Sequence, residues 1–138
     1  MNRASKLHLW VGITEKSQKD FDQYFDQTRA FLFDANGREK SQDEIVLSQF
    51  SKDIGKQASF DEDFLSIYFG GDNSDLNEAL AELADSEDFE IIQKTCIEKS
   101  VIEANAMFFY SDAEHDITDH RKKYNGLTYI GEFNSPYG

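Results

Sequence analysis

The sequence contains a single cysteine and a single proline. Cys96 has no second cysteine to pair with, which excludes an internal disulfide and argues against the disulfide-stapled class of small secreted domains. Pro136 lies close to the end of the sequence, so no segment has the composition of a stiff proline-rich linker. These absences favour one domain that spans residues 1–138 and works in a reducing compartment.

Long apolar runs are also missing. After the polar residues 1–6, the first apolar stretch covers only seven residues, 7–13 (LHLWVGI). That length is far below the roughly 20 residues of a membrane-spanning helix, and it is too short for the apolar region of a signal peptide with its cleavage site. No lipidation motif is visible. We therefore expect a soluble protein located in the cytoplasm.

Basic residues are scarce. The chain has 14 Lys and Arg residues against 27 Asp and Glu residues, which gives a formal net charge of −13. Such a balance repels nucleic acid and anionic membranes, and it favours encounter with a basic partner. The charge does not indicate disorder, because 39% of the residues are hydrophobic and 14% are aromatic, enough to build a core.

Hydrophobic periodicity predicts four strands and about four helices. The strands are expected at residues 7–13, 64–69, 105–110 and 127–133. The helices are expected to begin at Ser17, at Ser41, at Ser74 or a neighbour, and at Ser86, and Gly55 is expected to end the second one. This order indicates an α+β fold with one mixed sheet and helices packed mainly on one face. Residues 134–138 are expected to fray.

Sequence motifs of catalysis are absent. The pair Gly70 and Gly71 lacks the further glycines and the lysine of a phosphate-binding loop, and no Gly-x-Ser-x-Gly motif occurs. Cys96 lies in an apolar periodic stretch without a histidine signature, which favours a buried thiol over a nucleophile. The sequence therefore favours a binding protein over an enzyme, and no cofactor is expected.

One segment has the atoms of a metal site. Residues 112–120 (DAEHDITDH) contain two histidines and four carboxylates, the ligands that Zn²⁺ or Mn²⁺ would take. However, His115 and His120 are five residues apart, which is not the spacing that places two imidazoles on one helical face. The alternative is a solvated loop between the last two strands, and both readings stay open.

Charge placement is the most informative feature. Residues 61–90 contain eleven carboxylates and no Lys or Arg, whereas residues 121–123 gather basic charge. Four of these acids follow steps of three and four residues on the expected third helix, where like charges at such spacing are mildly destabilising. A solvated face that only aids solubility would also explain this pattern. The eleven residues are Asp61, Glu62, Asp63, Asp72, Asp75, Glu78, Glu82, Asp85, Glu87, Asp88 and Glu90.

The functional interpretation of this acidic run is electrostatic attraction of a basic protein. A carboxylate surface of one sign accelerates association with a basic partner by an order of magnitude or more at low salt. Proteins that cut nucleic acid have basic clefts, which an acidic surface can occupy as a phosphate mimic. The candidate partner-binding residues are Asp61, Glu62, Asp63, Asp72, Asp75, Glu78, Glu82 and Asp85.

Several short motifs resemble the immunity protein 22 family of bacterial polymorphic toxin systems. They are residues 8–12 (HLWVG), the acidic helix with Phe21 and Tyr24, residues 48–55 (SQFSKDIG) and residues 60–64 (FDEDF), with a weaker similarity at residues 107–110 (MFFY). The resemblance implies a cytoplasmic antidote that neutralises a secreted toxin in the producing cell or its siblings. It identifies neither the toxin nor any contact residue; the nuclease is our inference from charge.

Two rival interpretations remain. The first is a metal-dependent enzyme that uses His115, His120 and the neighbouring carboxylates. The second is an acidic regulatory domain that binds some other basic protein. The preferred hypothesis is a non-catalytic immunity protein that occludes the basic active site of a nuclease-like toxin.

Overall fold

The computed structural model describes residues 6–28, 30, 36–41, 45–56, 58–111 and 117–135. Backbone contacts divide the chain into two compact units. Lys16–Asp61 form one, which we call the two-helix unit, and Met1–Glu15 with Glu62–Gly138 form the other, which we call the sheet unit.

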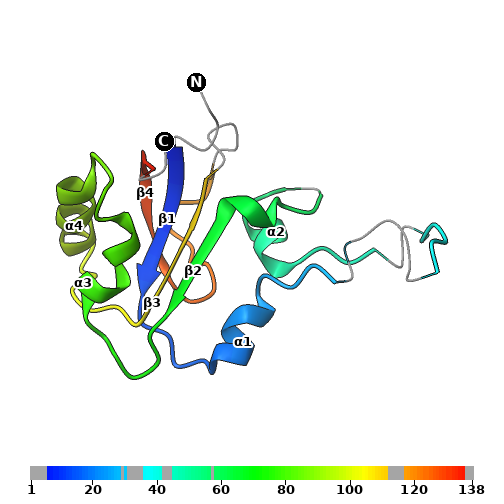
Figure 1. Cartoon of the computed structure of the whole chain (residues 1–138), viewed down its shortest axis with the longest axis horizontal. Coiled ribbons are helices and arrows are strands. Elements are labelled where there is room, and N and C mark those ends of the chain that lie inside the picture. Colours follow the sequence, from blue (N-terminus) through cyan, green and yellow to red (C-terminus); the bar gives the residue numbers. More distant parts are fainter. Residues whose placement is uncertain are drawn as a thin grey trace. The chain divides into compact units, whose positions relative to one another are not determined.

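The sheet unit contains four strands in the order β2-β3-β1-β4 (Figure 1). Their bounds are β1 Lys6–Gly12, β2 Leu65–Phe69, β3 Ala106–Tyr110 and β4 Thr128–Asn134. The predicted α+β class and the four strands are thus confirmed. All three strand pairings are antiparallel, where we expected a mixed sheet. The strands that run in the same direction, β1 with β2 and β3 with β4, are each separated by a strand of opposite direction.

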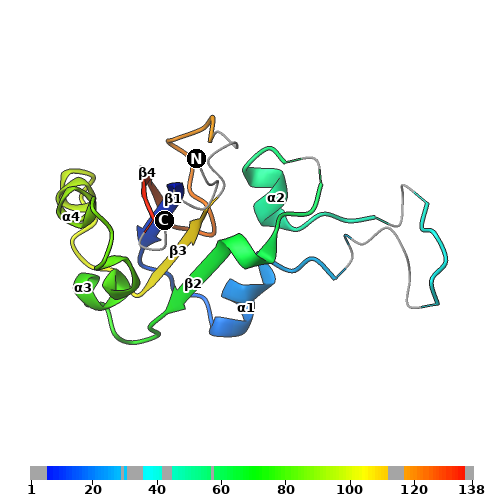
Figure 2. The same cartoon turned by 45° about the horizontal axis from the view of Figure 1, so that its top comes forward.

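One face of this sheet carries the helices of the unit. Alternate residues of β1, Leu7, Leu9 and Val11, join Met107 and Phe109 of β3 in one buried cluster. The same cluster includes residues of α3 (Leu76–Ala79), η4 (Ala81–Leu83) and α4 (Phe89–Glu98). Both views show α3 and α4 side by side on this face of the sheet (Figures 1 and 2). The period of two in β1 therefore determines which side chains meet the helices.

The opposite side chains of β1 build an aromatic cluster. Trp10 is fully buried and stacks on Phe108 with a ring separation of 4.8 Å. Tyr129 lies 5.3 Å from the Trp10 ring, and its hydroxyl is hydrogen-bonded to His8 Nδ1 at 2.8 Å. These contacts assign Trp10 a core role rather than a role in binding.

The end of β4 is more firmly held than we expected. Asn134 is the last residue of the strand and pairs with Lys6. Its backbone N–H donates to Asp88 Oδ2 at 2.8 Å, and its carbonyl accepts from the Ser86 hydroxyl. The expectation that fraying begins at Asn134 is therefore wrong, because side chains next to α4 satisfy the strand end. Residues 136–138 lie outside the described residues.

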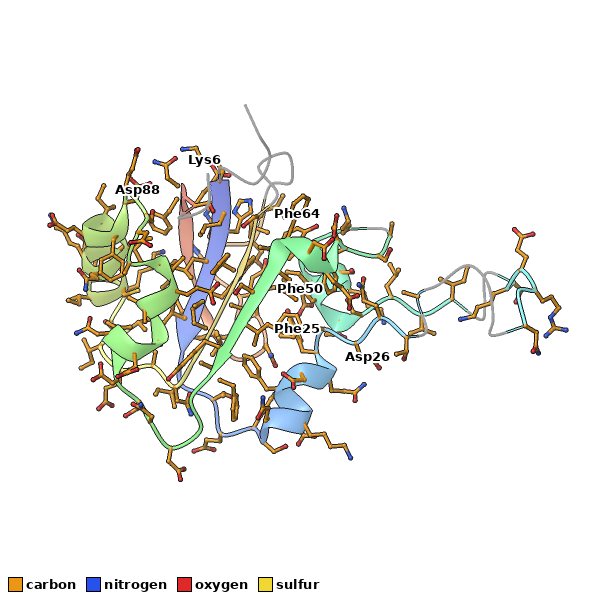
Figure 3. The ribbon with its side chains drawn as sticks, viewed as in Figure 1. Lys6, Phe25, Asp26, Phe50, Phe64 and Asp88 are labelled. Carbon is orange, nitrogen blue, oxygen red and sulfur yellow. The ribbon has the colours of Figure 1, made fainter. Side chains whose placement is uncertain are left out.

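The two-helix unit contains α1 (Gln18–Gln23) and α2 (Gln49–Asp53). Ser17 caps α1 as predicted, since its Oγ accepts from Asp20 N–H at 3.2 Å. Aromatic rings fill the space between the helices, with Phe25 and Phe50 separated by 5.3 Å between centroids (Figure 3).

The second predicted helix begins later than expected. Ser41 lies outside any helix, and Ser48 is the N-cap of α2, with its Oγ accepting from Ser51 N–H at 3.0 Å. The β-branched pair Ile45 and Val46 precedes the helix and disfavours a helical start there. Gly55 follows the helix with φ +79°, the left-handed conformation predicted for it.

Of the two remaining helix starts, one is as predicted and one is shifted. Asp75, a neighbour of Ser74, is the N-cap of α3, whereas Ser86 lies three residues before the first residue of α4. The Ser86 hydroxyl instead accepts from Asp88 N–H at 3.1 Å. Among the described residues, no helix has the length and apolar character needed to cross a bilayer.

Candidate functional site

The acidic run contains ten exposed carboxylates, since of its eleven acids only Asp88 is half-buried. At its beginning, Asp61 belongs to the two-helix unit, while Glu62 and Asp63 open η3 (Glu62–Phe64) in the sheet unit. The remaining carboxylates of the run all belong to the sheet unit.

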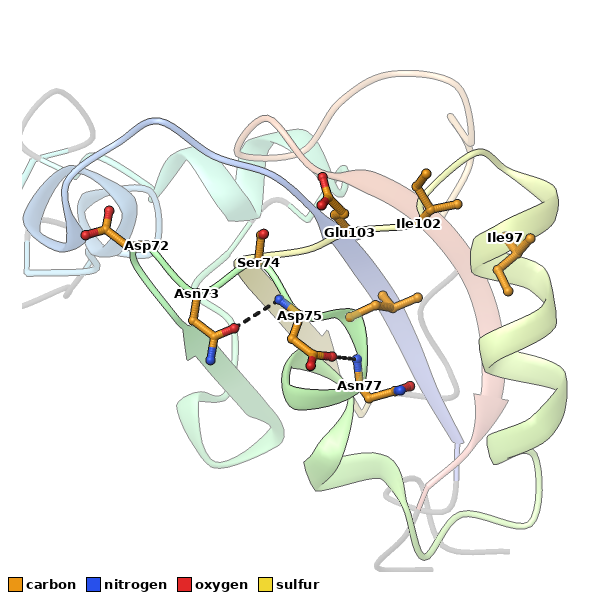
Figure 4. Close-up of a pocket in the computed structure, with 9 residues that line it drawn as sticks. Asp72, Asn73, Ser74, Asp75, Asn77, Ile97, Ile102 and Glu103 are labelled. Carbon is orange, nitrogen blue, oxygen red and sulfur yellow. Dashed lines mark hydrogen bonds between the residues drawn. The ribbon is translucent and has the colours of Figure 1, made fainter.

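The loop between β2 and α3 contains Asp72 and Asp75, both exposed. Asn73 Oδ1 accepts from Asp75 N–H at 3.0 Å, and Asp75 Oδ1 accepts in turn from Asn77 N–H at 2.9 Å (Figure 4). These two turns cap the start of α3 and fix the backbone of the loop. Asp75 is therefore a helix cap as well as a surface charge.

Glu78, Glu82 and Asp85 are exposed on or after α3, while Leu80 and Leu83 are fully buried. They do not form the single helical stripe that the spacing suggested, because α3 ends at Ala79 and the chain continues as η4. Glu82 accepts a hydrogen bond from the Ser66 hydroxyl on β2. This hydrogen bond links η4 to the sheet, so the Glu82 carboxylate has a structural contact as well as a surface charge.

A groove lies between the β2–α3 loop and the end of α4 (Figure 4). It is open to solvent and has a volume of about 670 Å³. Asp72, Asp75 and Glu103 place carboxylates around it, and Ile97 and Ile102 contribute apolar side chains. The remaining lining residues are Asn73, Ser74, Leu76 and Asn77.

Backbone hydrogen bonds join the two walls of this groove. Ala104 N–H donates to the Ser74 carbonyl at 3.0 Å, and Gly70 N–H donates to the Asn105 carbonyl at 2.6 Å. The Asn105 side chain donates from Nδ2 to the carbonyls of Gly71, at 2.8 Å, and Thr14, at 2.9 Å. The groove is thus built into the sheet unit in advance of any ligand.

The way in which α4 ends explains the exposure of Ile102. Ser100 has φ 68°, and Val101 N–H donates to the Cys96 carbonyl at 2.8 Å. Together with the bond from Ser100 N–H to the Ile97 carbonyl, 2.9 Å, this is a Schellman motif with serine at the left-handed position. The motif buries Val101 against the core and leaves Ile102 69% exposed at the groove.

A family model described as immunity protein 22 matches residues 7–135. The chain belongs to the immunity protein 22 family. Membership supports an immunity role, in which the protein binds a cognate toxin, and it confirms the family suggested by the sequence motifs. No curated protein and no solved structure matches the chain.

The candidate metal segment of this immunity protein is described only in part. Asp112, Glu114, His115 and Asp116 lie outside the described residues. His120 packs against Tyr129 at 4.9 Å between ring centroids, and its Nε2 donates to the Ile117 carbonyl at 2.6 Å. His120 therefore has a structural role in its loop. The described part of the chain holds no group of three or more His, Cys, Asp or Glu residues placed to bind a metal ion.

A neighbouring carboxylate in that loop also has a local role. Asp119 Oδ1 accepts from Arg121 N–H at 3.0 Å and from Lys122 N–H at 3.1 Å. These backbone donors stabilise the ionised carboxylate, which lowers the pKa of Asp119 from its usual value. The Asp119 carbonyl also accepts from the Tyr124 hydroxyl at 2.9 Å. Asp119 thus organises the turn that presents residues 121–123.

Cys96 of this family member is a core residue. Its side chain is fully buried among residues of α4 and the sheet. Burial in apolar surroundings raises the pKa of the thiol to about 11, because the charged thiolate is poorly solvated there. The thiol is therefore protonated at neutral pH and inaccessible to solvent. A nucleophilic cysteine needs the opposite, an accessible thiolate.

The sequence contains no signal that identifies the apolar part of the groove. Ile97 and Ile102 are 59% and 69% exposed, yet in the sequence they continue the apolar pattern of α4 and its following turn. Glu103 lies outside the acidic run of residues 61–90 and is brought to Asp72 only by the fold. An exposed isoleucine looks like a core residue until the packing is known.

Proposed function

We propose that this immunity protein neutralises a secreted nuclease toxin by covering its basic active site with the acidic surface of residues 61–90. The observation that carries the proposal is the charge of this run, with ten exposed carboxylates and no Lys or Arg. Membership of an immunity family supplies the class of partner. Inhibition is stoichiometric, and the protein acts in the cytoplasm of the producing cell.

The residues that carry the contact are Glu62, Asp63, Asp72, Asp75, Glu78, Glu82 and Asp85, with Asp61 ahead of them. Carboxylates of one sign raise the rate of encounter with a basic protein, and this effect is screened by salt. Repulsion between these groups is a cost that folding alone does not require. A partner with a basic cleft relieves this repulsion on binding, and the carboxylates then occupy the positions of the phosphates of the displaced nucleic acid.

Inhibition by occlusion needs no reaction on the immunity protein. The buried, protonated Cys96 and the structural role of His120 support this interpretation. Regulation of some other basic protein would use the same surface. Binding to the toxin domain encoded beside this chain's gene distinguishes the two possibilities.

The test is the association rate with that toxin domain, measured by biolayer interferometry at 50 mM and 500 mM NaCl. We expect one-to-one binding whose association rate falls about tenfold or more at the higher salt. The double variant Glu78→Lys/Asp85→Lys should associate several-fold more slowly than the wild type at low salt, with little change in thermal stability.

The matched control for this variant is Glu15→Lys/Asp22→Lys, which makes the same change in net charge at exposed residues outside the run. It should retain more of the wild-type association rate than the variant in the run. Association that is indifferent to salt and equal in both variants would show that this surface assignment is wrong.

A further inference from the structure

The geometry points to the groove between the β2–α3 loop and the end of α4 as the anchor of the complex. It takes an aliphatic side chain of the toxin that is flanked by Lys or Arg. This inference rests on the proposed function and deepens it. It distinguishes the groove, which holds the toxin in the complex, from the surrounding acidic surface, which only accelerates the encounter. Ile97, Ile102 and Glu103 add contacts that the acidic run alone does not contain.

The apolar part of the groove provides affinity that charge cannot. Carboxylates at the rim of an interface contribute mostly to the association rate, whereas desolvated apolar contacts near its centre govern dissociation. Ile97 and Ile102 are among the most exposed large hydrophobic side chains of the described chain, and both line this groove. Their burial by a partner removes apolar surface from water, which is favourable for binding.

The charge around the groove selects the class of occupant. Asp72 and Glu103 are exposed, and Asp75 is exposed although one of its oxygens caps α3 (Figure 4). An anionic or purely apolar segment would leave these carboxylates without a compensating charge. A second copy of this chain is disfavoured because each copy carries a formal net charge of −13. A basic segment with one apolar side chain satisfies both parts of the groove.

The walls are held in place before binding. Ala104 N–H bonds to the Ser74 carbonyl, and the Asn105 side chain holds the Gly71 carbonyl. The Schellman motif around Ser100 fixes the direction in which Ile102 leaves α4. A preformed site loses little conformational entropy on association, which favours a slow dissociation rate.

The experiment compares two pairs of matched variants in binding to the toxin domain encoded beside this chain's gene. The groove variants are Ile97→Ala/Ile102→Ala and Asp72→Asn/Glu103→Gln. Their controls are Ile91→Ala, an isoleucine of α4 that is 56% exposed outside the groove, and Glu15→Gln/Asp22→Asn, two exposed acids outside both the groove and the acidic run. All substituted side chains are exposed, so thermal unfolding should verify that each variant is folded.

We expect the double isoleucine variant to raise Kd by about tenfold or more, mainly through faster dissociation. The double amide variant should slow association several-fold, and both controls should stay within about twofold of the wild type.

Two kinds of failure can be distinguished. If the wild type binds and the groove variants behave like their controls, the groove is not the anchor, but the proposed function is left intact. Failure of the wild type to bind would instead refute the proposed function and the inference with it. A wild-type dimer in sedimentation that the isoleucine variant dissociates would also overturn the inference, because a second copy would then cover the groove.

Discussion

Ser100 illustrates how a single residue controls the site without taking part in it. It occupies the left-handed position of the Schellman motif, at φ 68°, which normally favours glycine. A side chain there costs roughly 1–2 kcal/mol relative to an unstrained position. The sequence offered a serine where the helix end usually shows a glycine, so the end of α4 could not be located from it.

We predict that Ser100→Gly raises the free energy of unfolding by about 0.5–1 kcal/mol. Relief of the strained backbone exceeds the larger entropy that glycine has in the unfolded chain. Urea denaturation at neutral pH measures the change. Ser100→Ala keeps the Cβ and serves as the control, with a change close to zero. Destabilisation by glycine would mean that the serine side chain contributes more than its backbone costs.

Cys96 predicts how stability depends on alkaline pH. The folded state keeps the thiol proton up to about pH 11, whereas the unfolded chain loses it near 9. Ionisation therefore stabilises only the unfolded state between these values, and the free energy of unfolding falls as pH rises through this window. The loss by pH 11 is on the order of 2–3 kcal/mol.

The control for Cys96 is Cys96→Ala, because other groups that titrate in this range are shared by both proteins. The difference in unfolding free energy between the two proteins should be constant up to about pH 8 and then shrink towards pH 11. Denaturation at a series of pH values gives this difference directly. A difference that stays constant across the range would mean that the thiol is accessible to water in the folded protein.

At the scale of elements, the connection between β2 and α3 depends on Asn105. Its buried side chain accepts from Thr14 N–H at 2.8 Å and donates to the carbonyls of Thr14 and Gly71. We predict that Asn105→Ala lowers the free energy of unfolding by about 2 kcal/mol, since buried backbone groups lose their partners. Chemical denaturation measures this loss.

Asn77→Ala is the comparison for Asn105. Asn77 is an exposed asparagine whose side-chain oxygen accepts from half-buried Gln93 Nε2 at 3.2 Å. Its removal should change the unfolding free energy by less than about 0.5 kcal/mol. Equal effects of the two substitutions would show that the Asn105 network contributes nothing of its own.

The strands were the most predictable elements. Each expected strand lies within one or two residues of the observed one, because apolar runs bounded by polar residues are a strong local signal. The second helix was less predictable, since Ser41 and Ser48 are both suitable caps. The later start is favoured by the β-branched pair Ile45 and Val46 and by the packing of Phe50 and Ile54. Pairing directions were not encoded locally, so the antiparallel sheet could not be distinguished from a mixed one.

The Asn-Gly pair at residues 125–126 forms a tight turn. Asn125 and Gly126 have φ 54° and 80°, and Tyr124 and Leu127 exchange two backbone hydrogen bonds around them. This is the two-residue hairpin that an Asn-Gly pair typically forms. It shows that the chain reverses immediately before β4, a reversal that the pair in the sequence could have predicted.

At the scale of the whole molecule, composition predicted the character of the surface but not its organisation. Charge of one sign in residues 61–90 follows from the sequence, whereas the groove requires Glu103 and two isoleucines from distant positions. The groove residues are brought together by the end of α4 and by the hydrogen bonds of Asn105. Neither of these features can be predicted from hydrophobic periodicity. The candidate contact residues therefore remain a prediction.

The most direct test of the immunity role is survival of cells that express the toxin domain encoded beside this chain's gene. Co-expression of the wild-type chain should restore growth, and the two proteins should co-purify as a one-to-one complex. The toxin domain alone should prevent growth in the same strain. Death of cells that contain abundant, folded immunity protein would contradict the account, because an inhibitor that acts by occlusion needs nothing more than its presence.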